Sequence, residues 1–287
     1  MRLASFIGLD GPSYGVVRGD GLVDLRRASG GRFPTLKSVL ADGDIGALLH
    51  SVRDAPADVP LEGLRYLPPL PDPDKIICVG VNYHAHRHET GRAESAYPVL
   101  FTRFANTQVG HGEPLVLPRA SRELDFEGEL AVVMGRRARH VAAKDALGYV
   151  AGYACYQDAS VRDWQRHTPQ FTPGKNFLAT GGFGPLLVMT DEIPDPSALT
   201  LSLRLNGEQM QHTPTDLMIF DIPALIQYIS TFTELVPGDV LVTGTPGGVG
   251  WKRTPPVFLR VGDIVEVEVS GVGILRNPVV AEAALSS

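Results

Sequence analysis

Alternating apolar residues and β-branched residues predict that strands dominate the chain after residue 75. Such runs lie at residues 75–80, 98–103, 127–135, 149–158, 184–190, 239–244 and 263–271. The segment 199–214 is predicted to be a hairpin, because Asn206 and Gly207 supply the two positive φ angles of a type I′ turn. Before residue 70, short strand patterns and a helix pattern at 35–52 predict a small α+β unit.

One further helix is predicted over residues 221–232, in the run DIPALIQYISTF. Asp221 can cap its N-terminus, and Pro223 fits the first turn. The apolar residues recur at helical spacing on one face, at Ile222, Leu225, Ile226, Ile229 and Phe232.

A proline-rich segment divides the chain. Residues 67–75, LPPLPDPDK, should be extended and unable to pair centrally in a sheet. We therefore expect a small N-terminal domain over residues 1–70 and a larger catalytic domain over residues 71–287. The class predicted from these elements is α+β, mainly β.

Composition and charge exclude several kinds of partner. The formal net charge is −6 and no run of Lys or Arg occurs, so nucleic acid and anionic membranes are not expected to bind. No apolar stretch approaches the roughly 20 residues of a membrane helix, and Asp10 and Gly11 interrupt the N-terminal apolar run too early for a signal peptide. We expect a cytoplasmic protein with Cys78 and Cys155 as buried reduced thiols, a disulfide between them being the alternative.

Acidic residues accompany the strand patterns at 127–135 and 149–158. Glu127 and Glu129 are two apart, so in a strand their carboxylates lie side by side and repel each other unless water or a cation lies between them. With Asp158 they would form a hard oxygen site for Mg²⁺ or Mn²⁺, with Ca²⁺ as a substitute in a crystal, and positions open for substrate. The alternative is a solvent-facing strand edge carrying unrelated acids.

Histidines gather in the run GVNYHAHRHETG, residues 80–91. One helical turn would join His86 to Glu89, and the carboxylate would then orient a general base. In an extended segment His84, His86 and His88 could instead bind zinc, although no soft fourth ligand is evident. A surface cluster without a role is a third interpretation.

Polar residues between 157 and 177 complete the candidate chemistry. Arg162, Gln165 and Lys175 would bind a substrate carboxylate or stabilise an oxyanion near the metal. The alternative is that Arg162 and Asp163 take part in ordinary surface salt bridges. The glycine clusters at 180–185 and 244–250 match no nucleotide-binding motif, so we interpret them as tight turns at strand ends.

Several of these segments, in this order, resemble the fumarylacetoacetate hydrolase family from about residue 75 to 280. The matching stretches are NYxxHxxE at 82–89, DFEGELAVVMG at 125–135, QDASVRDWQ at 157–165, GK at 174–175, LNGE at 205–208, MIF at 218–220, PGDVLVTGTPGGVG at 237–250 and a final GILRNPV. The resemblance implies a mixed β-sandwich roll, a homodimer, and a divalent metal held by Glu127, Glu129 and Asp158. It also implies a catalytic dyad of His86 and Glu89 on a short lid.

By position, the family's substrate-contacting residues match Arg162, Gln165, Lys175 and Thr245. Lys175 would also offset negative charge that develops in the reaction. Many relatives carry an acid where this chain has Leu178, so we expect a less polar pocket beside Lys175.

The resemblance implies hydrolysis of a carbon–carbon bond in a 1,3-dioxo acid, such as an acylpyruvate, with release of pyruvate in a catabolic pathway. Decarboxylation of a β-keto acid, or isomerisation of a 2-hydroxymuconate-type acid, would use the same metal site. A non-catalytic dicarboxylate-binding protein is an alternative from another class.

Overall fold

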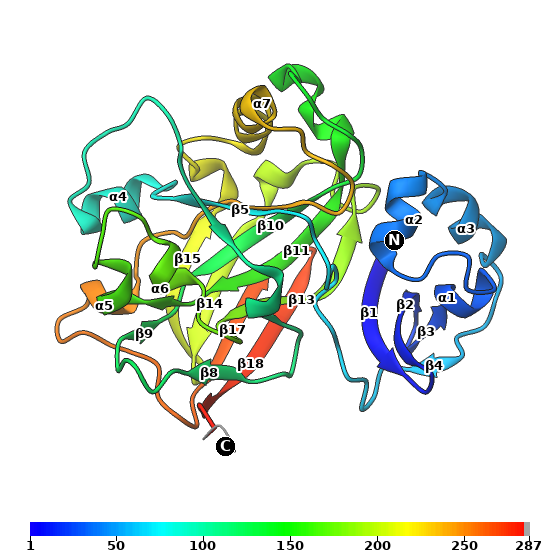
Figure 1. Cartoon of the computed structure of the whole chain (residues 1–287), viewed down its shortest axis with the longest axis horizontal. Coiled ribbons are helices and arrows are strands. Elements are labelled where there is room, and N and C mark those ends of the chain that lie inside the picture. Colours follow the sequence, from blue (N-terminus) through cyan, green and yellow to red (C-terminus); the bar gives the residue numbers. More distant parts are fainter. Residues whose placement is uncertain (284–287) are drawn as a thin grey trace.

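Strands form most of the framework in the computed structural model, which describes residues 1–283 (Figure 1). The larger sheet has the order β4 (Val59–Pro60), β3 (Gly21–Asp24), β2 (Gly11–Arg18), β1 (Arg2–Gly8), β13 (Gly181–Met189), β11 (Val150–Asp158), β10 (Gly128–Met134), β16 (Val240–Val242), β5 (Ile76–Gly80) and β6 (Val99–Arg103), and β7 (Gln108–Val109) pairs with β13. This mixed sheet confirms the predicted α+β, mainly β, class.

A second sheet packs against the first and creates the main core. Its order is β15 (Glu208–Pro214), β14 (Thr200–Leu205), β17 (Ile264–Val269), β18 (Gly273–Ala281) and β8 (Leu115–Leu117), while β9 (Leu124–Asp125) pairs with β12 (Ser160–Val161). Leu130 and Val132 of β10 pack in one buried cluster with Leu203 of β14 and Val267 of β17. Every residue of β10 is buried, as its continuous apolar run predicts.

Helices lie around the sheets. They are α1 (Leu25–Ala28), α2 (Leu36–Asp42), α3 (Ile45–Ser51), α4 (His84–Thr90), α5 (Arg162–Gln165), α6 (Thr172–Lys175) and α7 (Ile222–Phe232), with short 3₁₀ turns that include η5 (Gly250–Lys252). No helix among residues 1–283 is both long enough and apolar enough to cross a membrane.

The N-terminal unit joins the larger sheet through an antiparallel pair. Arg2 and Leu3 of β1 lie opposite Val188 and Leu187 of β13. The proline-rich residues 67–75 contain neither helix nor strand, as predicted. The proposed boundary at residue 70 stays a prediction.

Several local elements match the sequence pattern. Asn206 and Gly207 have φ angles of 54° and 84°, which confirms the type I′ hairpin between β14 and β15. Cys78 and Cys155 are both buried and unpaired, as expected of reduced thiols.

Glycines account for two differences from the predicted elements. The helix expected over 35–52 is two helices, because Gly43 has a φ of 75° and ends α2 in the left-handed conformation. The cluster at 180–185 is not a turn, since β13 begins at Gly181. A Cβ on Gly182 would lie 2.6 Å from Asn277 Oδ1, so glycine there permits close packing between the sheets.

The cap of α7 provides a test of the fold. The Asp221 side chain accepts a hydrogen bond from the Ala224 N–H at 2.8 Å. Asp221→Ala should lower the free energy of unfolding by about 1 kcal/mol, because an N-terminal amide loses its acceptor. Urea denaturation measures this, with Asp221→Asn as the control that keeps an acceptor oxygen. An alanine variant as stable as the wild type would contradict the role of the cap.

Candidate metal centre and active site

Three acidic side chains converge where β10 begins and β11 ends. Antiparallel pairing sets Gly128 opposite Gln157, and the Asp158 N–H donates to the Glu127 carbonyl at 2.9 Å. One oxygen from each of Glu127, Glu129 and Asp158 lies within 4.8 Å of the other two. All three residues are at most 5% exposed, so the alternative of a solvent-facing edge is wrong.

Buried cations surround these acids. Lys175 Nζ lies 2.6 Å from Glu127 Oε2 and 2.5 Å from Asp158 Oδ2. Arg103 Nη1 lies 2.5 Å from Asp158 Oδ1, and Arg162 Nη2 lies 2.5 Å from Glu127 Oε1. The repulsion expected between the acids is therefore offset by the chain's own side chains.

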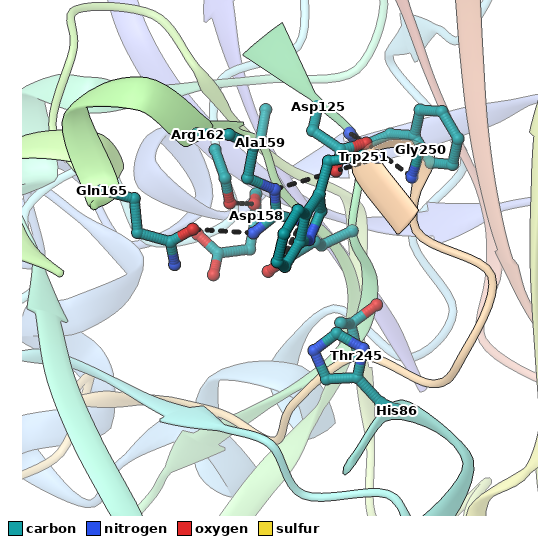
Figure 2. A network of polar contacts seen from close by, with 12 residues as sticks. His86, Asp125, Asp158, Ala159, Arg162, Gln165, Thr245, Gly250 and Trp251 are labelled. Carbon is teal, nitrogen blue, oxygen red and sulfur yellow. Dashed lines mark hydrogen bonds and ion pairs between the residues drawn. The ribbon is translucent and has the colours of Figure 1, made fainter. Parts of the chain in front are cut away.

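The buried side chain of Arg162 is held by the carboxylate of Asp125, a residue that the sequence patterns did not assign to the site. Asp125 Oδ2 accepts from Arg162 Nε at 2.8 Å, and Asp125 is fully buried. Arg162 Nη1 also donates to Gln165 Oε1 at 2.9 Å. The alternative of ordinary surface salt bridging is therefore wrong for Arg162, which is buried. Figure 2 shows this network, with Asp125 bonded to Arg162 on one side and to Gly250 and Trp251 on the other.

Opposing charges set the protonation of Glu127 and Lys175. Burial raises the pKa of Glu127, but Arg162 and Lys175 outweigh it and hold this pKa at about 2. Burial lowers the pKa of Lys175, but Asp158 and Glu127 outweigh it and raise this pKa above its ordinary value. Lys175 therefore stays an ammonium ion, suited to charge stabilisation and not to acting as a base.

Glu129 is the acid with the least compensation. Its Oε2 accepts from the Gly244 N–H at 2.6 Å, while its Oε1 has no hydrogen bond or ion pair within residues 1–283. Burial, together with the charges of Asp158 and Glu127, raises the pKa of Glu129 well above its ordinary value.

The donor set fits a divalent cation. Four carboxylates, those of Asp125, Glu127, Glu129 and Asp158, face three cations, those of Arg103, Arg162 and Lys175, which leaves one negative charge when all the acids are ionised. Carboxylate oxygens are the ligands that Mg²⁺ and Mn²⁺ prefer. Glu127, Glu129 and Asp158 are the residues that can hold such an ion.

His86 and Glu89 form a second feature on α4. His86 Nδ1 lies 2.7 Å from Glu89 Oε1, and Glu89 Oε2 accepts from the Gly248 N–H at 2.9 Å. Because this segment is helical, His84 and His88 share one exposed face and His86 points away from it, so the extended zinc arrangement is wrong. His86 is buried, which also excludes a surface histidine without contacts.

The glycine-rich loop 244–250 was expected to be an ordinary turn, but its backbone organises the site. The N–H groups of Gly244, Gly248 and Gly250 donate to the carboxylates of Glu129, Glu89 and Asp125, respectively. Gly244 and Gly248 both have a φ of 103°, a conformation that favours glycine. A Cβ on Gly250 would lie 1.9 Å from the Val257 carbonyl oxygen, so no larger residue fits.

Thr245 lies in the same loop. Its hydroxyl donates to the Gly128 carbonyl at 3.0 Å and accepts from Gln211 Nε2 at 2.9 Å. These two bonds fix the Thr245 side chain beside the first residue of β10.

One cavity connects these groups. The predicted residues that line it are His86, Glu127, Glu129, Arg162, Gln165, Lys175 and Thr245. Apolar walls come from Val79, Phe101, Phe171 and the ring of Trp251, whose buried indole N–H has no hydrogen-bond acceptor within residues 1–283. Leu178 is 68% exposed and does not line the cavity, so the expectation of a less polar pocket beside Lys175 is wrong.

Comparison with known proteins gives consistent matches over almost the whole chain. Residues 75–280 match the family described as "Fumarylacetoacetate (FAA) hydrolase C-terminal". The mitochondrial oxaloacetate tautomerase Fahd2a of Rattus norvegicus is 40% identical, over 98% of this chain and 92% of that protein. The human mitochondrial oxaloacetate tautomerase FAHD2A is 39% identical over the same shares.

Solved structures extend the match to the fold. The fumarylacetoacetate hydrolase of psychrophilic Exiguobacterium antarcticum is 33% identical with a TM-score of 0.83, covering 98% of this chain and all of that one. The maleylpyruvate hydrolase of Sphingobium sp. SYK-6, solved with manganese(II) and pyruvate, is 32% identical with a TM-score of 0.82, covering 99% of this chain and all of that one. The mixed β-sandwich roll is thus confirmed.

Two isosteric substitutions should shift the stability of the metal-free protein in opposite directions. The folded-state pKa of Glu129 is raised, so its ionised form destabilises the fold at neutral pH; Glu129→Gln should raise the melting temperature in EDTA, increasingly so as pH rises. The folded-state pKa of Glu127 is lowered from 4.5 to about 2, so its ionised form stabilises the fold above that range. Glu127→Gln should therefore cost about 3 kcal/mol at pH 7.

The measurement is thermal unfolding in EDTA between pH 5 and 8. Addition of Mg²⁺ or Mn²⁺ is expected to raise the melting temperature of the wild type but not of either variant, since each variant lacks one candidate ligand carboxylate. Two variants that shift the melting temperature in the same direction would contradict this distribution of charge.

Proposed function

Because this chain belongs to the fumarylacetoacetate hydrolase family, we propose that it is a divalent-metal-dependent enzyme that interconverts the keto and enol forms of a short 2-oxo acid. One observation carries the proposal: His86, held by Glu89, lines the same cavity as the carboxylate cluster. A base beside a site of positive charge is what removal of a proton next to a carbonyl requires.

Glu127, Glu129 and Asp158 would hold Mg²⁺ or Mn²⁺ at the inner end of this cavity. A bound ion would supply positive charge to the substrate's carboxylate and adjacent carbonyl oxygen. The manganese(II) and pyruvate named for the related maleylpyruvate hydrolase structure support an ion and a 2-oxo acid of this kind.

The chain's own residues account for the proton transfer. His86 Nδ1 faces Glu89, which leaves Nε2 to take a proton from substrate C3. The electrons of that C–H bond form the C2–C3 double bond, and the π electrons of the C2 carbonyl move onto its oxygen. This oxygen takes a proton from water, and His86 returns its proton to the solvent, so the reaction is an isomerisation. The Lys175 ammonium would offset negative charge that develops on the oxygen. Arg162 and Gln165 line the same cavity and would orient the substrate.

A second candidate is the hydrolysis of an acylpyruvate. His86 would then take a proton from water, the oxygen would attack the distal carbonyl, and the carbon–carbon bond would break to leave the enol of pyruvate. The maleylpyruvate hydrolase relative supports this reaction. We rank tautomerisation first because the tautomerases match 98% of this chain at higher identity. Decarboxylation would use the same groups.

One assay separates these reactions. Oxaloacetate in its enol form is mixed with the protein in Mg²⁺ or Mn²⁺, and the enol absorbance and the pyruvate released are followed together. Tautomerisation predicts loss of absorbance without pyruvate, whereas decarboxylation produces pyruvate, and hydrolysis produces it from acetylpyruvate. Activity that persists in EDTA would refute metal dependence, and lack of turnover on the whole panel would favour a binding protein.

His86→Ala tests the proposed base. We expect kcat to fall about 10²- to 10⁴-fold, because no other group would take the C3 proton, while metal affinity measured by titration stays close to that of the wild type. His88→Ala is the matched control, since His88 lies on the same helix but is exposed and outside the cavity. A His86→Ala variant with full turnover would contradict the assignment.

A further inference from the structure

Among the cations that line the cavity, Arg92 differs from the other two. Arg162 and Lys175 contact the buried acids, as described above. The Arg92 side chain, in contrast, has no ion pair and no hydrogen bond within residues 1–283, and it is exposed. A guanidinium group without an anionic partner is therefore available at the solvent side of the cavity.

The backbone gives Arg92 a defined position. Gly91 ends α4 with a φ of 66°, and the Arg92 N–H donates to the Arg87 carbonyl at 3.2 Å. The Arg92 guanidinium carbon lies 5.4 Å from the centre of the Phe171 ring, and this ring packs edge-on against Phe101 at 5.7 Å. A guanidinium group that stacks on an aromatic ring keeps its N–H edge free for an anion.

Charge indicates which ligand would complete this arrangement. The four buried carboxylates and their three cations carry one net negative charge, so a bound divalent ion would make this group positive by one charge. In the proposed function, this group binds the 2-oxo-acid end of the substrate. The second positive charge of the cavity is that of Arg92, and a fork of N–H groups matches a carboxylate in geometry as well as in charge. A substrate with a negative charge at each end satisfies both.

We propose that Arg92 is a specificity-determining residue, which binds the distal carboxylate of a dicarboxylic 2-oxo acid. The inference rests on the proposed function, because the cluster must hold the other end of the substrate. A neutral acyl tail would gain nothing from Arg92, and would lose nothing either, because the exposed guanidinium stays hydrated. Arg92 therefore discriminates by attracting one class of substrate.

The proposed base and Arg92 lie on the same segment of the chain. His86 and Glu89 lie on α4, and Arg92 directly follows its C-terminal cap. Engagement of a distal carboxylate by Arg92 would hold this segment over the cavity and so help to place His86. A dicarboxylate should benefit in KM chiefly, with a smaller gain in kcat.

The test compares Arg92→Met with a matched control. Arg87→Met removes an arginine from the same segment, but Arg87 is paired with Glu94 at 3.2 Å and lies outside the cavity. With oxaloacetate, Arg92→Met should raise KM about 10- to 100-fold, because the variant loses one charge-assisted pair with the substrate. The change in kcat should be smaller. With acetylpyruvate, which has no distal carboxylate, its kinetics should equal those of the wild type. Arg92→Lys should recover part of the difference.

Calorimetric titration of the Mn²⁺-loaded protein separates this inference from the proposed reaction. Difluorooxaloacetate, which has no C3–H, should bind less tightly to Arg92→Met, whereas oxalate should bind equally to variant and wild type. If this binding pattern is found but the wild type turns over no substrate, the proposed reaction would be overturned and the role of Arg92 supported. The role of Arg92 would be overturned if the protein turned over oxaloacetate but Arg92→Met lost activity equally on oxaloacetate and acetylpyruvate, or lost no activity on either substrate.

Discussion

Compensation of buried charge is the constraint on which the rest of this structure depends. Carboxylates without water need counter-charges close by, since an uncompensated buried ion costs several kcal/mol. Arg103, Arg162 and Lys175 supply these charges from β6, α5 and α6, so segments distant in sequence must meet at the end of β11. The compensation is incomplete at Glu129, and the residual negative charge there destabilises the metal-free protein and favours the binding of a cation.

The glycine-rich loop at residues 244–250 fixes the positions of several carboxylates in the site. Its backbone amides bind three carboxylates that serve different purposes, because Glu129 belongs to the proposed metal centre, Glu89 orients His86, and Asp125 holds Arg162. Backbone donors cannot change rotamer, so the relative positions of these acids are set by the loop itself. The proposed base, the candidate metal ligands and the arginine proposed to orient the substrate are thus connected through one short segment.

Local patterns in the sequence predicted much of this arrangement. The spacing of Glu127 and Glu129 predicted neighbouring carboxylates, and the spacing of His86 and Glu89 predicted contact across one helical turn. Arg103 and Asp125 were not assigned, because a single charged residue in a strand pattern says nothing about a partner 55 or 37 positions away. The glycine clusters were misinterpreted because composition alone does not separate a turn from a strand packed against a neighbour, or from a loop that donates to carboxylates. Leu178 was misplaced for a similar reason, since adjacency to Lys175 in sequence did not place its side chain in the cavity.

The pairing of β1 with β13 has a consequence for how the chain can be divided. β1 covers one side of β13, the strand whose other side pairs with β11 and so borders Asp158. If the first 70 residues were removed, the backbone of β13 around Leu187 and Val188 would become an open sheet edge beside newly uncovered apolar surface. Such an edge recruits strands from other molecules, so a shortened chain would tend to aggregate even though every residue of the cluster remained in it. The N-terminal unit therefore protects an edge of the sheet on which the candidate metal ligands lie.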